Sequence, residues 1–316
     1  HRAQLCRRAD QRHRTLREPR HDRRSGRPAR PVRHAAAGTL IMARPFFFSP
    51  QAASAVVMVR PHHFTVNTET ANDNRFQKVP ETGQDLRRRA YDEISRAGEI
   101  LSSAGIPVHM FEDEGDTTPD SVFPNNWFST HAGGHVAIFP MKARNRRLER
   151  RPDIIETLKR DYRVQDVIDY SGLEADGLFL EGTGAMVLDH IDRVAYVVRS
   201  ERADPVALER FATHFNFEPM VFDARDPQGM AIYHTNVLMC IGTGFVLIGP
   251  DMMTEPDRRA EILDRLRRTG RDIIALDNDQ IARFAGNALE LQAPDQRLLA
   301  LSRLRSKPCV PTRLRR

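Results

Sequence analysis

The stretch GAMVLDHIDRVAYVVRSERADPVALERFATHFNFEPMVFD, residues 184–223, contains the unit from which we expect the fold to be built. Its apolar runs at 184–188 and 194–198 are short and predict a pair of buried strands. Asp204–Phe215 carries apolar residues at helical spacing, and residues 219–223 are again extended. The stretch therefore predicts two strands, a helix and a further strand.

Strands and helices of this kind recur along the chain, in about four comparable groups. This recurrence predicts a repeat-built α/β domain with modules arranged around an axis, and the alternative is an ordinary mixed α/β sandwich. No strand is followed by G-x-G-x-x-G or a phosphate-binding loop, which argues against a doubly wound nucleotide-binding fold. The glycine pairs at 182–184 and 242–244 are interpreted as hairpin turns. Further strands are expected at 55–61, 108–111, 121–129, 135–140, 163–168, 178–180, 237–241, 244–248 and 272–276, and helices at 86–104, 150–161 and 256–269.

The positive net charge of +6 comes from the two ends of the chain. Residues 1–34 and 303–316 hold 18 of the 48 basic and 3 of the 42 acidic side chains, so residues 35–302 carry 30 basic and 39 acidic ones. A nucleic-acid-binding domain places its basic side chains on the folded surface. The acidic centre therefore argues against nucleic acid as a partner.

The composition limits the classes of protein to which the chain can belong. Of 316 residues, 40% are apolar and 28% charged, which suits a chain with a packed core. No run approaches the roughly 18 apolar residues that span a bilayer, so we expect no membrane partner. Cys6, Cys240 and Cys309 are too few and too scattered for a disulfide framework, and a reducing, cytoplasmic setting is the default expectation.

Both ends differ from the middle in composition. We expect residues 1–53 to form a disordered, Arg-rich arm; a transit peptide is one alternative, and translation upstream of a native start at Met42 is another. Residues 54–302 are expected to form the catalytic α/β domain. The basic tail 303–316 follows a regular segment abruptly, and a lost reading frame or a truncation would explain it.

Four polar groups of residues interrupt the apolar strands. PDSVFPNNW (119–127) brings Asp120, Asn125 and Asn126 together, although an Asx-rich turn would have the same composition. Glu181 ends a strand beside a glycine turn, and His234 opens a buried strand. A His and a Glu at the ends of separate strands supply a general acid–base and the carboxylate that orients it, whereas either alone is more often structural.

The fourth group, Ser200-Glu201-Arg202, offers an arginine for a substrate carboxylate, with an exposed helix-cap arginine as the alternative. His131 and His135 are four residues apart, but two glycines between them argue against a helix, and no third ligand is in view. We therefore expect neither a metal nor an organic cofactor.

With these groups in this order, the sequence resembles the guanidino-group-modifying (pentein) superfamily of arginine deiminases, dimethylarginine dimethylaminohydrolases and amidinotransferases. It is most similar to the arginine-deiminase-related, citrulline-utilisation hydrolase branch. The resemblance spans about residues 57–302, and its motifs are specific only together. They are MVRPHHFTVNTETANDNRFQ (58–77), PDSVFPNNWFSTH (119–131), LEGTGAMV (180–187), YHTNVLMCIG (233–242) and FAGNALEL (284–291).

The resemblance implies a five-fold pseudosymmetric α/β propeller of ββαβ modules with the site on its axis and the last module incomplete. It also implies a cysteine thiolate that attacks a guanidino or ureido carbon, with a histidine as acid–base and an acid that holds it. His234 matches that histidine and Glu181 that acid. Asp120 matches an acceptor for a substrate nitrogen, and Arg202 the arginine that grips the amino-acid carboxylate.

Two departures from the family pattern matter. Asn125-Asn126 stands where arginine-handling members often place a carboxylate, and an amide, which both donates and accepts, suits the uncharged ureido group of citrulline. The family's nucleophile follows a glycine-rich turn near the C-terminus, and this sequence holds no such turn. Cys309 has no glycine turn beside it, and Cys240 is interpreted as a small core residue.

These observations favour a hydrolase that cleaves a non-peptide C–N bond of a ureido or guanidino amino acid, with citrulline favoured over arginine and with the nucleophile missing from the chain as given. The alternatives are an amidinotransferase, in which an amine replaces water, and a non-catalytic binding member of the same fold. The expected partner is the small-molecule substrate, and a homo-oligomer is left open.

Overall fold

The computed structural model describes residues 49–70 and 83–301. Contacts between residues divide the chain into two units, His1–Pro45 and Phe46–Arg316, and every described residue belongs to the second. The arm predicted for residues 1–53 and the tail 303–316 thus lie almost wholly outside the described residues. Among those described, no helix is long and apolar enough to cross a membrane.

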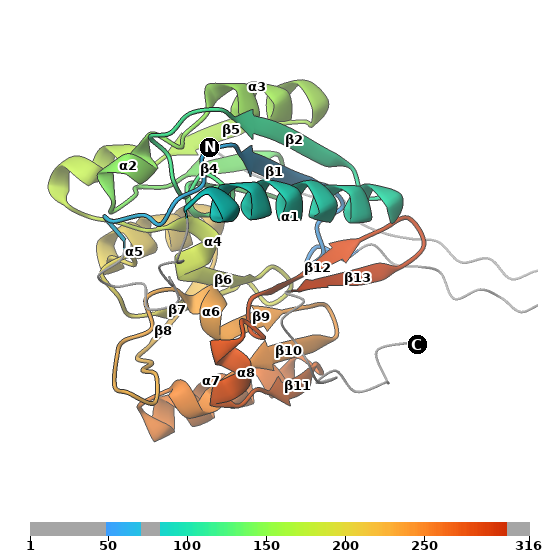
Figure 1. Ribbon diagram of the computed structural model, residues 1–316. Helices are drawn as coiled ribbons and strands as arrows, with labels where there is room; N and C mark the ends of the chain where they lie inside the picture. Colours follow the sequence, from blue (N-terminus) through green and yellow to red (C-terminus); the bar gives the residue numbers. More distant parts are fainter. Residues whose placement is uncertain (1–48, 71–82, 302–316) are drawn as a thin grey trace, which may run out of the picture. The chain divides into compact units, whose positions relative to one another are not determined.

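Among the residues that the structure describes, three of the five sheets share one topology (Figure 1). In each, two strands form an antiparallel hairpin, a helix follows, and a third strand returns parallel to the second strand of the hairpin. The three units are β3 (Phe128–His131), β4 (His135–Ile138), α3 (Pro152–Asp161) and β5 (Asp166–Asp169); β6 (Met186–Asp189), β7 (Val194–Val198), α5 (Pro205–Phe215) and β8 (Glu218–Phe222); and β9 (Met239–Ile241), β10 (Phe245–Ile248), α7 (Pro256–Arg268) and β11 (Asp272–Ala275).

The other two sheets have two strands each. β1 (Val56–Pro61) pairs in parallel with β2 (Val108–Asp113) across α1 (Gly83–Ser103). β12 (Ala288–Gln292) and β13 (Arg297–Leu301) form an antiparallel hairpin. The expectation of a mixed α/β fold with a repeated unit is confirmed, whereas the arrangement of the units about a five-fold axis stays a prediction.

The sheets pack through strands that are apolar on both faces. All five residues of β7 are buried, because β7 is the middle strand of its sheet. A buried ion pair joins two neighbouring units: Arg271 Nη1 and Nη2 lie 2.6 and 2.8 Å from the carboxylate oxygens of Asp189. Arg271 Nε also donates to Gly242 O at 2.9 Å, so this side chain ties the β6–β7 turn to the β9–β10 turn.

Several expected strands begin later than the sequence pattern indicated. Residues 121–129 are not one strand, because the 3-10 helix η1 (Pro124–Asn126) precedes β3. The strands expected at 184–188 and 237–241 each begin with a short helix, α4 (Gly182–Ala185) and α6 (Thr235–Leu238). The glycine pair at 182–184 is therefore a helical turn, whereas that at 242–244 does connect a hairpin. Residues 178–180 form no strand, only an isolated bridge from Leu180 to Ala203.

Candidate active site

The turns that precede β6 and β9 bring Glu181 and His234 together. Glu181 is the N-terminal cap of α4, and His234 is the N-terminal cap of α6. His234 Nε2 lies 2.9 Å from Glu181 Oε2, and both side chains are buried. A hydrogen bond of this length fixes the orientation of the imidazole ring.

Glu181 is held ionised by the charges around it. Burial acts to raise the pKa of Glu181, but the hydrogen bond from His234 and the positive charges of Arg202 and Arg146 outweigh it and hold the pKa below its usual range. Its second oxygen, Oε1, accepts a hydrogen bond from the backbone N–H of Lys142 at 3.2 Å. The carboxylate is therefore fixed at both oxygens.

The surroundings of His234 favour the neutral form of its ring. Burial lowers its pKa, and the hydrogen bond that it donates to Glu181 opposes this only in part. With Nε2 donating to Glu181, Nδ1 carries the free lone pair of the ring. A Cβ on Gly184 would lie 2.9 Å from Nδ1, so glycine at this position is what keeps that side of the ring open.

Arg202 lies beside the same carboxylate. Its Nη1 is 3.2 Å from Glu181 Oε2, and its guanidinium carbon stands 4.9 Å from the centre of the Tyr233 ring. Arg202 is buried. The structure thus places it in the group of Glu181 and His234, where it stabilises the charge of Glu181.

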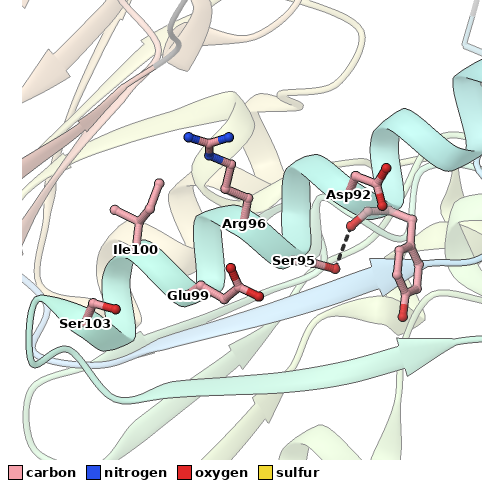
Figure 2. Close-up of a pocket in the computed structure, with 7 residues that line it drawn as sticks. Asp92, Ser95, Arg96, Glu99, Ile100 and Ser103 are labelled. Carbon is pink, nitrogen blue, oxygen red and sulfur yellow. Dashed lines mark hydrogen bonds between the residues drawn. The ribbon is translucent and has the colours of Figure 1, made fainter.

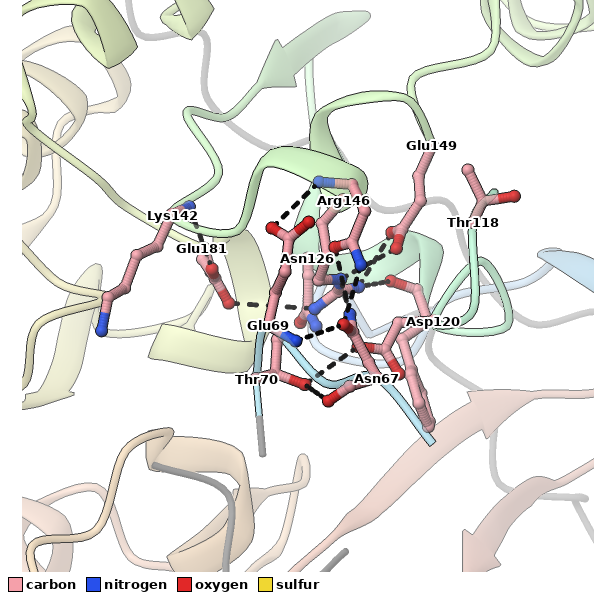
Figure 3. Close-up of polar contacts among 12 residues, drawn as sticks. Asn67, Glu69, Thr70, Thr118, Asp120, Asn126, Lys142, Arg146, Glu149 and Glu181 are labelled. Carbon is pink, nitrogen blue, oxygen red and sulfur yellow. Dashed lines mark hydrogen bonds and ion pairs between the residues drawn. The ribbon is translucent and has the colours of Figure 1, made fainter. Parts of the chain in front are cut away.

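Asp120 belongs to an adjoining polar group (Figure 3). Its Oδ2 accepts from Asn67 Nδ2 at 2.8 Å and from Thr70 Oγ1 at 3.4 Å, and Arg146 Nε stands 3.8 Å away. Within the described part of the chain, no side chain or backbone group hydrogen-bonds to Oδ1. Asp120 therefore has one oxygen held in place and a second that is left to accept a hydrogen bond.

Arg146 connects the two groups, and the sequence analysis did not single it out. It is 2% exposed and lies on α2 (Arg144–Arg147). Its Nε and Nη2 each lie 2.9 Å from Glu149, and its Nη1 is 3.8 Å from Glu181 Oε2 (Figure 3). These carboxylates raise its pKa further, although burial opposes them. The guanidinium of Arg146 thus forms ion pairs with Glu149, Glu181 and Asp120.

Asn125 and Asn126 lie on η1, against the turn that follows Glu181. Asn126 is buried, and its side-chain oxygen, turned toward Arg146, accepts from Nη1 at 2.7 Å and Nη2 at 3.2 Å. Asn125 is half-buried, and its backbone oxygen accepts from Thr183 Oγ1 at 3.3 Å. All six residues expected at the site thus lie in two adjoining groups, which Arg146 joins.

The cysteines are placed differently. Cys240 lies in β9 within the apolar cluster that includes Val246 and Leu247, which suits a small core residue. Cys6 and Cys309 lie outside the described residues. Among the described His, Cys, Asp and Glu side chains, no group of three or more is arranged to hold a metal ion.

An open hollow of about 640 Å³ runs along α1, lined by residues such as Tyr91, Arg96 and Glu99 (Figure 2). Its lining contains none of the site residues above. In the same hollow Ser95 Oγ donates back to Tyr91 O at 2.7 Å, a bond internal to the helix. The hollow is a feature of the helix surface and does not form part of the site.

The buried pair of His234 and Glu181 and the repeated α/β units agree with the class of protein that the sequence motifs indicated, the guanidino-group-modifying (pentein) superfamily. Within it, the chain belongs to the family described as N,N-dimethylarginine dimethylhydrolase, eukaryotic, whose model matches residues 60–308. This is a family of guanidino-group hydrolases. A comparison with curated protein sequences finds no match.

Solved structures with a similar fold include arginine dihydrolases of cyanobacteria. The apo structure of ArgZ matches at a TM-score of 0.57 and 18% identity, over 74% of this chain and 33% of that one. The N-terminal domain of ArgZ, a cysteine-to-serine mutant bound to substrate, matches at 0.58 and 17%, over 74% and 79%. A cysteine-to-alanine mutant of AgrE with L-arginine matches at 0.57 and 19%, over 74% and 32%. The chain spans about a third of the length of the full ArgZ and AgrE chains, and these identities support the fold alone.

Proposed function

We propose that the site hydrolyses a non-peptide C–N bond of a ureido or guanidino amino acid. The observation that carries the proposal is the buried hydrogen bond of 2.9 Å between His234 and Glu181. A neutral imidazole whose second nitrogen is open can take the proton of a thiol, pass it to a departing amine and later take a proton from water, and the charge of Glu181 stabilises the imidazolium formed each time.

The covalent step needs a thiolate. It forms when the thiol gives its proton to His234 Nδ1; it then attacks the central carbon of the substrate, the C–N bond breaks, and the amine leaves with that proton from His234. Water then attacks the covalent intermediate and gives a proton to His234, which passes it to the sulfur as the C–S bond breaks. The nucleophile in this proposal lies outside the described residues. Cys240 is packed in the apolar core, and Cys309 has no glycine turn beside it, so neither is proposed as the nucleophile.

The remaining residues of the proposal bind substrate. Asp120 accepts a hydrogen bond from a substrate nitrogen through Oδ1, and Arg202 contributes positive charge for the amino-acid carboxylate. We favour citrulline because Asn125 and Asn126 carry amides, which match a group with both N–H donors and a C=O acceptor.

Arginine is the second candidate substrate. Asp120 offers a carboxylate oxygen, Oδ1, that accepts no hydrogen bond within the described part of the chain, and a carboxylate oxygen is a good partner for a guanidinium. ArgZ is described as an arginine dihydrolase, and AgrE was solved with L-arginine. The cytoplasmic setting and a homo-oligomer stay predictions.

The test is ammonia release from citrulline and from arginine, measured beside binding of both compounds by calorimetry. His234→Ala should lower the rate by several orders of magnitude, and Glu181→Gln by less. His214→Ala, at an exposed histidine of α5, is the matched control and should leave the rate unchanged. Full activity in His234→Ala would contradict the mechanism, and faster turnover of arginine would contradict the preference for citrulline. Binding without turnover would contradict the hydrolase and favour the alternative, a non-catalytic binding member of the same fold.

A further inference from the structure

Arg146 holds both ends of the 3-10 helix η1 (Pro124–Asn126). Its Nη2 donates to the backbone oxygen of Phe123, the residue that precedes η1, at 3.3 Å. Its Nη1 and Nη2 lie 2.7 and 3.2 Å from the side-chain oxygen of Asn126, the last residue of η1. Glu149 fixes the guanidinium in this place by accepting from Nε and Nη2, both at 2.9 Å (Figure 3). The position of η1 therefore depends on Arg146.

The guanidinium also decides which way round the side-chain amide of Asn126 stands. Arginine carries N–H donors and no acceptor, so an amide can meet it only with its oxygen. The NH2 group of Asn126 is thereby turned away from Arg146. An amide without such a neighbour could turn by half a rotation and present its oxygen on the other side instead.

The NH2 group of Asn126 is turned toward the open side of the His234 ring. In this orientation the amide nitrogen lies 2.2 Å from the point that a Cβ on Gly184 would occupy, and His234 Nδ1 lies 2.9 Å from the same point. The nitrogen is also 3.1 Å from the side-chain amide of Asn125, whose oxygen can accept one of its two N–H groups. Among the described residues, the second N–H group has no hydrogen-bond partner. A donor thus stands beside the nitrogen of His234 that carries the free lone pair.

The direction of this donor bears on the choice of substrate. We propose that Arg146 is a positioning residue which, by orienting Asn126, makes the site select a substrate that has a carbonyl oxygen. A ureido group has such an oxygen and can accept the N–H of Asn126. A guanidinium has only donors, so it would leave this N–H unpaired, which costs free energy in a buried site. The role rests on the function proposed above and gives a physical reason for a preference for citrulline.

The experiment measures binding of L-citrulline and L-arginine to the full chain by calorimetry. Wild type should bind citrulline more tightly. Arg146→Lys keeps the charge, but an ammonium group lacks the planar fork that holds both Glu149 and the Asn126 oxygen, so the amide is free to turn. The ratio of the citrulline affinity to the arginine affinity should then fall by about tenfold, as expected for one hydrogen bond. Arg268→Lys, at an exposed arginine of α7, is the matched control.

Asn126→Asp separates orientation from structure. A carboxylate has an acceptor on both sides, so nothing changes when it turns. In this background Arg146→Lys should leave the affinity ratio unchanged, and a further fall of about tenfold there would overturn the proposal. An equal loss of affinity for both ligands in the single variant Arg146→Lys would show a purely structural role and leave the proposed function standing. A wild-type preference for arginine would also overturn the proposal, because an NH2 group offers a guanidinium no lone pair.

NMR of the wild-type chain gives a second readout that needs no change at Arg146. The side-chain amide protons of Asn126, identified by their loss in Asn126→Asp, should shift when citrulline binds and shift less when arginine binds. If they stay in place while citrulline binds, the role of Arg146 is disproved, even where Arg146→Lys does not fold. If the wild-type chain binds neither ligand, the function proposed above is wrong, and the role of Arg146 fails with it.

Discussion

At the scale of single residues, the site depends on the balance between burial and charge at His234. Burial lowers the pKa of the imidazole, and the carboxylate of Glu181 raises it again in part. The result is a neutral ring that is ready to accept a proton. Glu181 can play this part only because Arg146 and Arg202 keep it ionised despite complete burial.

Glu181→Gln should therefore lower the pKa of His234 further, because the amide removes the one negative charge that favours the imidazolium. The measurement is a pH titration of the His234 ring by NMR, which needs no turnover. We expect the titration midpoint to move to more acid pH. A midpoint that stays in place or rises would show that Glu181 does not set the charge of His234.

Arg146 lies beside three carboxylates, although its charged stretch of sequence is typical of a solvated surface. Arg146→Met keeps most of the volume but leaves Glu149, Glu181 and Asp120 without their shared cation. Removing one partner from a buried ionic network costs about 3–5 kcal/mol, and we expect the free energy of unfolding to fall by this amount. Urea denaturation measures it, with Arg268→Ala as the control that should change by less than about 0.5 kcal/mol. A small change in Arg146→Met would mean that the carboxylates are not ionised together.

At the scale of elements, the site is made by short turns placed just before hairpins. The turns of α4 and α6 position Glu181 and His234, and η1 presents Asn125 and Asn126. Because each turn packs on the one before it, a change in one should displace the side chains of its neighbour.

Gly184 lies where two of these turns pack closely, so a side chain added there should displace its neighbours. In Gly184→Ala the added methyl would meet both the Asn126 amide and the His234 ring, so we expect a loss of about 1–3 kcal/mol in stability and weaker substrate binding. Gly172→Ala is the control, because a Cβ there meets nothing within 4 Å. Thermal unfolding and calorimetry separate the two effects. Equal behaviour of the two variants would contradict the close packing of the turns.

The sequence was enough to predict the residues that interrupt apolar strands, and for that reason Asp120, Glu181 and His234 could be named in advance. Arg146 could not, because it lies in RNRRLER (144–150), a charged run that is typical of a solvated surface. Its burial results from Asp120 and Glu181, which other parts of the chain bring to it, together with Glu149 in the same run. The strand expected at 121–129 was wrong because Pro124 begins the 3-10 helix η1. The β-branched and aromatic residues beside it favour a strand but do not prevent this turn.

At the scale of the whole molecule, the described units are joined by buried polar groups as well as by apolar packing. Arg271 and Asp189 connect two hairpin turns, and Arg146 joins α2 to the turns of the site. An aromatic contact also joins two units, because the His131 ring of β3 stands 4.2 Å from the Phe215 ring of α5. His131 and His190 belong to different units, so their titration reports on the packing between the units.

Stability should fall in mild acid because of these histidines. Burial, together with the nearby His190 and Arg193, lowers the pKa of His131 to about 3, and burial lowers that of His190 to about 4. In the unfolded chain both take up a proton near pH 6.5, so the stabilisation is complete above that pH and is lost as the pH falls toward 4. At pH 5 the loss for His131 alone is about 2 kcal/mol. His131→Phe should remove this part of the pH dependence of urea unfolding between pH 7 and 5, while His214→Phe, at an exposed histidine, should retain it. If His131→Phe lost as much stability in acid as wild type, burial of a neutral His131 would be disproved.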